Sequence, residues 1–163
     1  MLIFINMSER GKTVFQGGII SDKAIQGKSS TIDVSGTSII KLDSNYPSNT
    51  TFNIDLQSGD VIGFSFPPLS QDDIGKEFDF FVQGAPGLST GAYIRFSTSV
   101  GSVLKGIATC LDSTLEIRDA VRIDIAEYRY LGGTLIKAKV MNNTQISFQA
   151  SLSGDASILT ITS

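Results

Sequence analysis

The sequence contains no histidine, no tryptophan and only one cysteine, Cys110. Because histidine is the commonest general base and the commonest neutral metal ligand, its absence excludes Ser-His-Asp and Cys-His catalytic centres within the chain. A single cysteine likewise excludes an intramolecular disulfide and a zinc site built from cysteines. Cys110 lies in the apolar stretch 103–111, and we expect it to be a small buried hydrophobic residue.

Charge and long apolar runs are also scarce. Thirteen Lys and Arg stand against sixteen Asp and Glu, which gives a net charge of −3. We therefore expect no broad nucleic-acid-binding surface. No window approaches the roughly 20 apolar residues of a membrane helix, and the apolar run 2–5 is too short for a signal-peptide core. These patterns predict a protein made in a cytoplasm, with no membrane partner.

What the chain does have is alternation of apolar and polar residues. A length of 163 residues predicts one domain, large enough to bury a core without disulfides. A period of two is the mark of strands with one buried and one wet face. The segments that show it most clearly are 51–57, 60–66, 76–83, 92–97, 120–127 and 134–141.

Weaker strand candidates and frequent turn signals fill most of the remaining chain. Ser58-Gly59-Asp60 and Gly132-Gly133 predict tight hairpin turns, and Asn142-Asn143 predicts another turn. Helix is expected only as a turn or two, at 70–75. We predict an all-β fold, a jelly-roll-like sandwich or small barrel of about ten to twelve strands, with an extended N-terminal arm.

The N-terminal region has a different composition from the rest. Residues 7–50 are rich in serine and glycine and contribute few large apolar groups. We predict an arm or edge strands over 1–35 and a sandwich or barrel body over 36–163. Short apolar anchors in the arm would pack on a neighbouring subunit or partner, whereas the alternative makes 2–5 the first strand of the body. The anchors are Leu2, Phe4, Phe15 and Ile19.

Candidate chemistry is sparse. Glu77 and Asp79 lie two apart on one predicted strand, as paired carboxylates of a glycosidase or lyase would, but surface charges are the favoured interpretation. Asp72 and Asp73 could serve a Ca²⁺ loop, although acids also favour a first helical turn. The glycine-rich stretch 84–91 lacks the lysine of a phosphate loop and is either a plain connection or a binding loop. We predict no catalytic, cofactor-binding or metal-binding residue.

Several aromatic residues fall on outward strand faces. They would form either a sugar-binding platform or a subunit interface. Phe81 interrupts the wet side of its strand, so we expect 76–83 to be covered on both faces, by the arm or by a second subunit. The aromatic residues predicted to bind a partner are Phe81, Tyr128 and Tyr130.

Part of the chain resembles a known group of proteins. The segments that carry the resemblance are Ser58-Gly-Asp-Val-Ile-Gly63, Ile74-Gly-Lys-Glu-Phe-Asp-Phe-Phe-Val82, Tyr93-Ile-Arg-Phe-Ser97 and Gly101-Ser-Val-Leu-Lys-Gly-Ile107. Over residues 50–110 the chain is similar in style to small all-β virion proteins of tailed bacteriophages, above all to capsid decoration (cement) proteins. The resemblance implies a β-barrel or sandwich that trimerises on the shell and clamps neighbouring capsid subunits, with no catalytic residues.

The resulting expectation is a non-enzymatic virion protein that needs no cofactor. It would bind the major capsid protein on the capsid exterior as a homotrimer, after synthesis in the host cytoplasm. The alternative is a carbohydrate- or receptor-binding tip of a tail or head fibre, which would use the loop 84–91 and exposed tyrosines.

Overall fold

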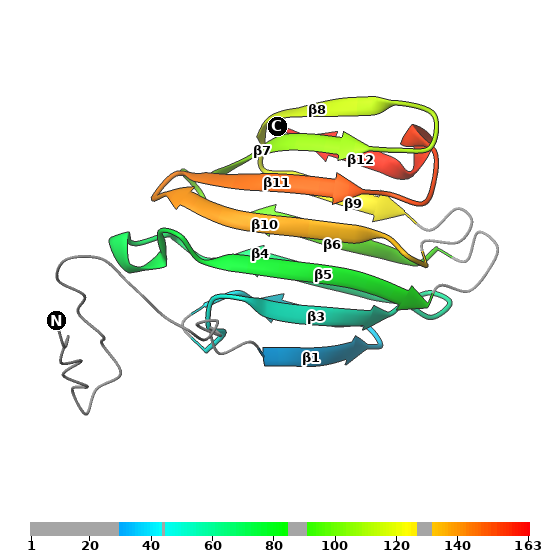
Figure 1. Cartoon of the computed structure of the whole chain (residues 1–163), viewed down its shortest axis with the longest axis horizontal. Helices are drawn as coiled ribbons and strands as arrows, with labels where there is room; N and C mark the ends of the chain where they lie inside the picture. The colour runs from blue at the N-terminus through cyan, green and yellow to red at the C-terminus, as the bar shows by residue number, and fades with distance from the viewer. Residues whose placement is uncertain (1–29, 44, 85–90, 127–131) are drawn as a thin grey trace, which may run out of the picture.

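The protein is a sandwich of two β-sheets packed face to face (Figure 1). The computed structural model describes residues 30–43, 45–84, 91–126 and 132–163. These residues form twelve strands and two short 3₁₀ helices, η1 (Gln71–Asp73) and η2 (Ala156–Ile158). The predicted all-β sandwich is therefore confirmed.

The two sheets differ in size. The seven-stranded sheet contains, in spatial order, β1 (Ser30–Ser35), β3 (Thr50–Asp55), β5 (Glu77–Gly84), β10 (Leu135–Asn142), β11 (Gln145–Ser151), β7 (Val103–Thr109) and β8 (Thr114–Ala120). The five-stranded sheet contains β12 (Leu159–Thr162), β9 (Arg122–Ala126), β6 (Tyr93–Thr98), β4 (Val61–Phe66) and β2 (Ser38–Lys41).

The first six strands wind as a coil between the sheets. Each strand from β1 to β6 enters the sheet opposite to that of its predecessor, so β1, β3 and β5 stack in parallel in one sheet. Likewise β2, β4 and β6 stack in parallel in the other. From β9 and β10 onward most pairs are antiparallel. The connectivity thus differs from that of a jelly roll, whose strands pair antiparallel.

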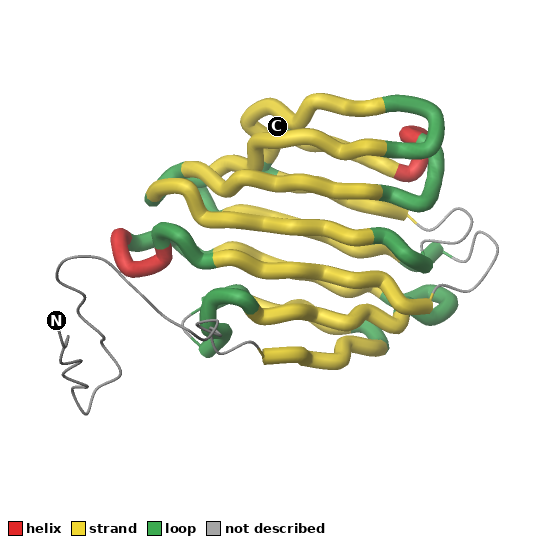
Figure 2. The backbone as a smooth tube through the Cα atoms, viewed as in Figure 1, coloured by secondary structure: helices red, strands yellow, loops and turns green. Residues whose placement is uncertain are grey.

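Two turns predicted to be hairpins lie instead in connections between strands of different sheets (loops and turns are green in Figure 2). Ser58-Gly59-Asp60 joins β3 to β4, and the Asp60 carboxylate closes it by accepting the backbone N–H of Gln57 at 2.9 Å. Gly132-Gly133 precedes β10, whereas the preceding strand, β9, lies in the opposite sheet. The hairpin predictions at these two turns are wrong, because a tight turn has similar residues whether the next strand pairs beside the last or crosses the core.

Two other local predictions have clear outcomes. The turn after β10 does form a hairpin with β11, where the Asn142 side chain accepts the backbone N–H of Thr144 at 2.9 Å. The segment 120–127 is not one strand, because the chain changes sheets at the exposed Val121.

Phenylalanines from both sheets form the centre of the core. Neighbouring rings in this cluster lie 4.6–5.4 Å apart between centroids, and all five are fully buried. Aromatic pairs at such distances each contribute about 0.5–1.5 kcal/mol beyond their burial. The members are Phe52, Phe64, Phe80, Phe96 and Phe148.

Cys110 lies at the margin of the core. Its side chain is buried, as predicted from its apolar neighbours. Burial, assisted by the nearby carboxylates of Asp112 and Asp155, raises the pKa of the thiol. The residue therefore behaves as a small hydrophobic side chain.

Gly106 allows β7 and β11 to approach closely. Its parallel register partner is Phe148, and a Cβ on Gly106 would lie 1.8 Å from the Phe148 carbonyl oxygen. We expect Gly106→Ala to lower the free energy of unfolding by at least about 2 kcal/mol in urea titrations, because the strands must separate. In Gly132→Ala the new Cβ would meet only the Gln83 carbonyl at 3.6 Å, so this control should change stability by less than about 0.5 kcal/mol.

The connection between β4 and β5 is organised by Asp73 in η1. One carboxylate oxygen accepts hydrogen bonds from the Ser70 backbone N–H at 2.8 Å and hydroxyl at 2.7 Å. The other oxygen accepts a hydrogen bond from Lys76 Nζ at 2.7 Å. Just after η1, the Gly75 backbone N–H donates to the Val140 carbonyl oxygen of β10. The bonds from Lys76 and Ser70 lower the pKa of Asp73 to about 2. The predicted helical turn is present, and Asp73 binds neighbouring side chains within it.

This carboxylate should make stability depend on pH. Because folding lowers its pKa, its contribution to the free energy of unfolding is complete above the ordinary aspartate pKa of 3.8 and is lost as the pH falls toward about 2. We expect Asp73→Asn to lower the free energy of unfolding by about 1–2 kcal/mol at pH 7 and by progressively less below pH 3.8. Urea unfolding at several pH values measures this, and a deficit that stays constant on acidification would contradict it. The exposed Asp72→Asn is the control at pH 7.

Candidate functional site

The face of the seven-stranded sheet that points away from the core, called the outer face below, is the broadest surface built by regular structure. On β5 and β10 the odd-numbered residues point outward, because the even-numbered Phe78, Phe80, Ile136 and Ala138 are buried. Antiparallel register then places outward residues of the two strands opposite each other. The pairs are Glu77 with Lys139, Asp79 with Lys137, and Phe81 with Leu135.

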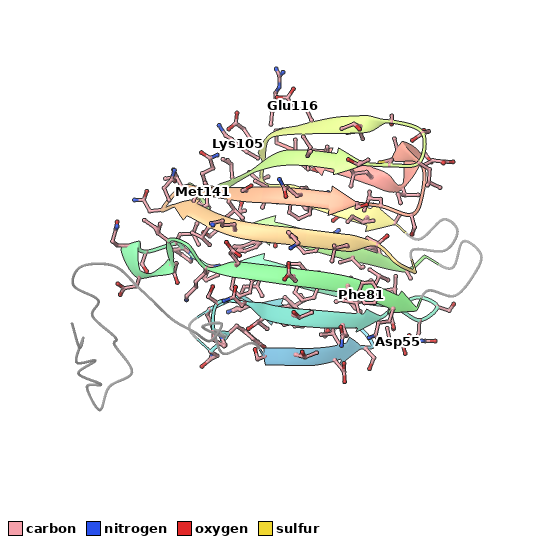
Figure 3. The ribbon with its side chains drawn as sticks, in the orientation of Figure 1. Asp55, Phe81, Lys105, Glu116 and Met141 are labelled. Atoms are coloured by element: carbon pink, nitrogen blue, oxygen red, sulfur yellow. The ribbon has the colours of Figure 1, made fainter. Side chains whose placement is uncertain are left out.

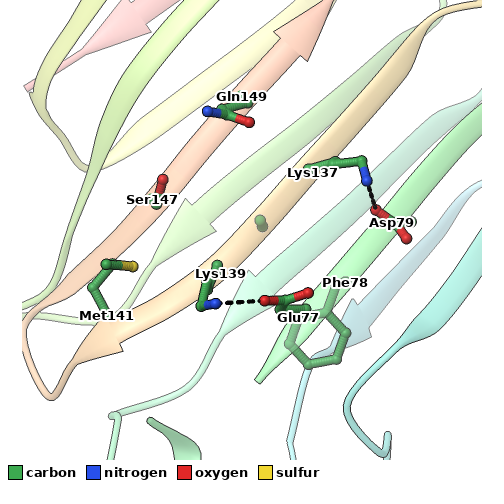
Figure 4. A pocket seen from close by; sticks show the side chains of 9 residues that line it. Glu77, Phe78, Asp79, Lys137, Lys139, Met141, Ser147 and Gln149 are labelled. Atoms are coloured by element: carbon green, nitrogen blue, oxygen red, sulfur yellow. Dashed lines mark hydrogen bonds and ion pairs between the residues drawn. The ribbon is translucent and has the colours of Figure 1, made fainter. Parts of the chain in front are cut away.

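Two of these pairs form an ion-pair ladder (Figure 4). Lys139 Nζ donates to Glu77 Oε1 at 2.6 Å, and Lys137 Nζ lies 3.6 Å from Asp79 Oδ1. The ladder borders an open hollow of about 310 Å³. Met141 of β10 and two polar residues of β11, Ser147 and Gln149, complete its rim. The hollow thus offers charged, hydroxyl and amide groups together with one thioether.

The carboxylates predicted to be surface charges do lie on a wet face. The side chains of Glu77 and Asp79 are 48% and 39% exposed, and each has its own lysine. A glycosidase acid needs a carboxyl group in apolar surroundings beside a second, charged carboxylate. The observed arrangement is instead that of a solvated cross-strand ladder, in which each ion pair contributes about 0–1 kcal/mol.

Apolar side chains interrupt this polar face at several places. Phe81 is 37% exposed and its cross-strand partner Leu135 is 40% exposed, so together they form an apolar pair on β5 and β10. Met141 and Ile107 are also exposed on β10 and β7. Figure 3 places Phe81 and Met141 toward opposite ends of the face. No described strand or helix covers Phe81, and the arm expected to cover β5 on its second side lies mostly outside the described residues.

The other predicted partner-binding residues lie outside the described residues. They are Leu2, Phe4, Phe15, Ile19, Tyr128 and Tyr130, and the loop 85–90 lies outside as well. Of the predicted arm or edge segment 1–35, residues 30–35 form β1, at the edge of the seven-stranded sheet.

Sequence reasoning did not single out Leu135 or Met141. The signal was available, because burial of Ile136, Ala138 and Val140 by alternation requires outward positions on either side of them. What the alternation could not supply was the pairing of β10 with β5, which brings Leu135 beside Phe81 from 54 positions away in the sequence.

The outward side of the five-stranded sheet carries a compact charged cluster. Arg95 binds both carboxylate oxygens of Asp124, at 2.7 and 3.0 Å, and these hydrogen bonds raise the pKa of the guanidinium. Arg122 lies 3.3 Å from the same carboxylate. The Arg95 guanidinium also lies 4.9 Å from the centre of the Tyr93 ring. Tyr93 is therefore already in contact with a neighbouring side chain.

No protein-family model matches the chain, and no significant match to a curated protein or a solved structure was found. Among residues 30–43, 45–84, 91–126 and 132–163, no group of three or more His, Cys, Asp or Glu is placed to hold a metal ion. In the part of the chain that the structure describes, no helix has the length and apolar character to cross a membrane.

Proposed function

We propose that the chain is a non-enzymatic structural protein of a tailed-bacteriophage virion, which binds the major capsid protein on the capsid exterior and reinforces the shell. The outer face is the surface that makes this contact. Support for the class comes from the resemblance of residues 50–110 to decoration proteins. Support for the surface comes from the exposed Phe81–Leu135 pair beside the ion-pair ladder.

The apolar pair is the single observation that carries the choice of surface. Interface cores are enriched in aromatic residues surrounded by a polar rim, and Phe81 with Leu135 has such a rim in Asp79 and Lys137. Neither side chain contributes to the core of the sandwich. Both side chains are therefore available for binding, and replacing either of them should not unfold the protein.

Co-sedimentation with capsid shells tests the proposal. The shells are assembled from the major capsid protein of the virus that encodes the chain and are stripped of the chain itself. We expect Phe81→Asp to raise the dissociation constant at least about tenfold, because it places a charge in the apolar centre of the interface. The melting temperature should stay within a few degrees of the original.

A matched control is available away from the outer face. Val100 lies in the connection between β6 and β7 and is fully exposed, so Val100→Asp makes a similar change outside the outer face. We expect its shell affinity to equal that of the unchanged protein. Absence of shell binding by the unchanged protein, or equal losses in both variants, would contradict the proposal.

A second candidate function is suggested by the hollow beside the ladder. Its hydroxyl, amide, carboxylate and ammonium groups can exchange hydrogen bonds with sugar hydroxyls, as expected of a carbohydrate- or receptor-binding fibre tip. A glycan array distinguishes the two functions. Glycan binding that is lost in Gln149→Ala and kept in Phe81→Asp would favour the sugar-binding function.

A further inference from the structure

One end of the sandwich is formed by two edge strands, β1 and β2. Among the described strands each has a neighbour on one side only, β3 for β1 and β4 for β2. Figure 1 shows β1 at the end of the seven-stranded sheet opposite to β8. The outer backbone groups of such strands can pair with another extended chain.

At this end both edge strands pair regularly with their neighbours, and apolar side chains are exposed. Ile39 on β2 is 78% exposed, and the inward residues Ile32 and Ile40 are only partly buried. The far end is different, because β8 carries an exposed Glu116–Arg118 ion pair and its pairing with β7 has a register shift. Irregular pairing is one of the usual protections against strand addition, and β1 and β2 do not have it.

The two edge strands carry opposite charges that have no ionic partner. Lys41 on β2 is the one lysine or arginine among the described residues without a carboxylate within 4 Å. Asp33 on β1 accepts a hydrogen bond from Asn53 at 3.1 Å and forms no ion pair with a lysine or arginine of the described residues. Both side chains are exposed on the outward faces of their strands.

The connection between these strands fixes the relation between the two charges. β1 runs into a tight turn and β2 runs out of it, so both strands extend to the same side of the turn with opposite chain directions. Asp33 and Lys41 each lie four positions from Thr37. The two residues therefore stand at nearly the same level along the strand direction. A two-fold axis that runs parallel to the strands at this end would preserve that level.

We propose that this end is a self-complementary interface, through which two copies of the chain pair about such an axis. β1 of one copy lies antiparallel to β2 of the other, and the same contact occurs twice. Each sheet then continues into the opposite sheet of the other copy. An isologous contact of this kind closes the assembly at two subunits.

The register that follows from this axis gives complementary neighbours on both faces of the paired strands. Asp33 lies opposite Lys41 of the other copy, and Ser35 lies opposite its Ile39. On the inward side, Val34 faces Ile40 of the other copy and Ile32 faces its Leu42, so the two hydrophobic cores become continuous. A two-fold axis perpendicular to the sheets would instead place each strand against its own copy, and Asp33 would not meet Lys41. Charge complementarity therefore selects the axis that runs along the strands.

Sedimentation equilibrium of the full chain with charge-reversed variants tests this interface. The unchanged protein should reach twice its 17.4 kDa chain mass at micromolar concentration. Asp33→Lys and Lys41→Asp should each raise the dimer dissociation constant at least about tenfold, because each change turns two attractive pairs into repulsive ones. The double variant Asp33→Lys/Lys41→Asp restores opposite charges and should recover the dimer.

Controls separate the interface from general effects of charge and folding. Glu116→Lys makes a charge reversal on the far edge and should leave the dimer constant unchanged. Ile39→Glu, at a residue too exposed to support the fold of one copy, should also give monomers with the original circular dichroism spectrum. A monomer or a trimer of the unchanged chain, or a double variant that does not recover, would overturn the inference.

Discussion

Contacts between phenylalanine rings across the sandwich hold the two sheets together. Phe64 and Phe96 come from one sheet, Phe80 and Phe148 from the other, and each ring contacts at least one ring from the opposite side. These residues belong to central strands, so the coil of β1–β6 and the later strands share one core. The outer face depends on this arrangement, because burial of Phe78 and Phe80 turns Glu77, Asp79 and Phe81 outward.

The strands themselves were predictable from the sequence because alternation is local. Segments such as 76–83 and 134–141 each show a wet and a dry side within a few residues, and both became strands with the expected faces buried. The sheet that each strand joins was not predictable. The residues Ser-Gly-Asp favour a tight turn in a hairpin and in a crossing between sheets alike, and only the long-range contacts of the core distinguish the two.

The same limit applies to the functional surface. Phe81 could be recognised because it interrupts the polar side of its own strand. Its apolar partner Leu135 lies beside it only because β5 pairs with β10. The same pairing brings up the lysines that neutralise Glu77 and Asp79. A binding face on a sheet is assembled across strands, so its residues are identified singly by sequence and as a group only by register.

The order of strands in the seven-stranded sheet has a consequence for synthesis on the ribosome. β10 and β11 lie between β5 and β7, although they follow both in the sequence. A nascent chain that ends before Leu135 contains the β1–β3–β5 and β7–β8 portions of this sheet, but no strand joins them within the sheet. Two interior edges stay unpaired until residues 135–151 leave the exit tunnel, and during that interval the chain is most exposed to aggregation.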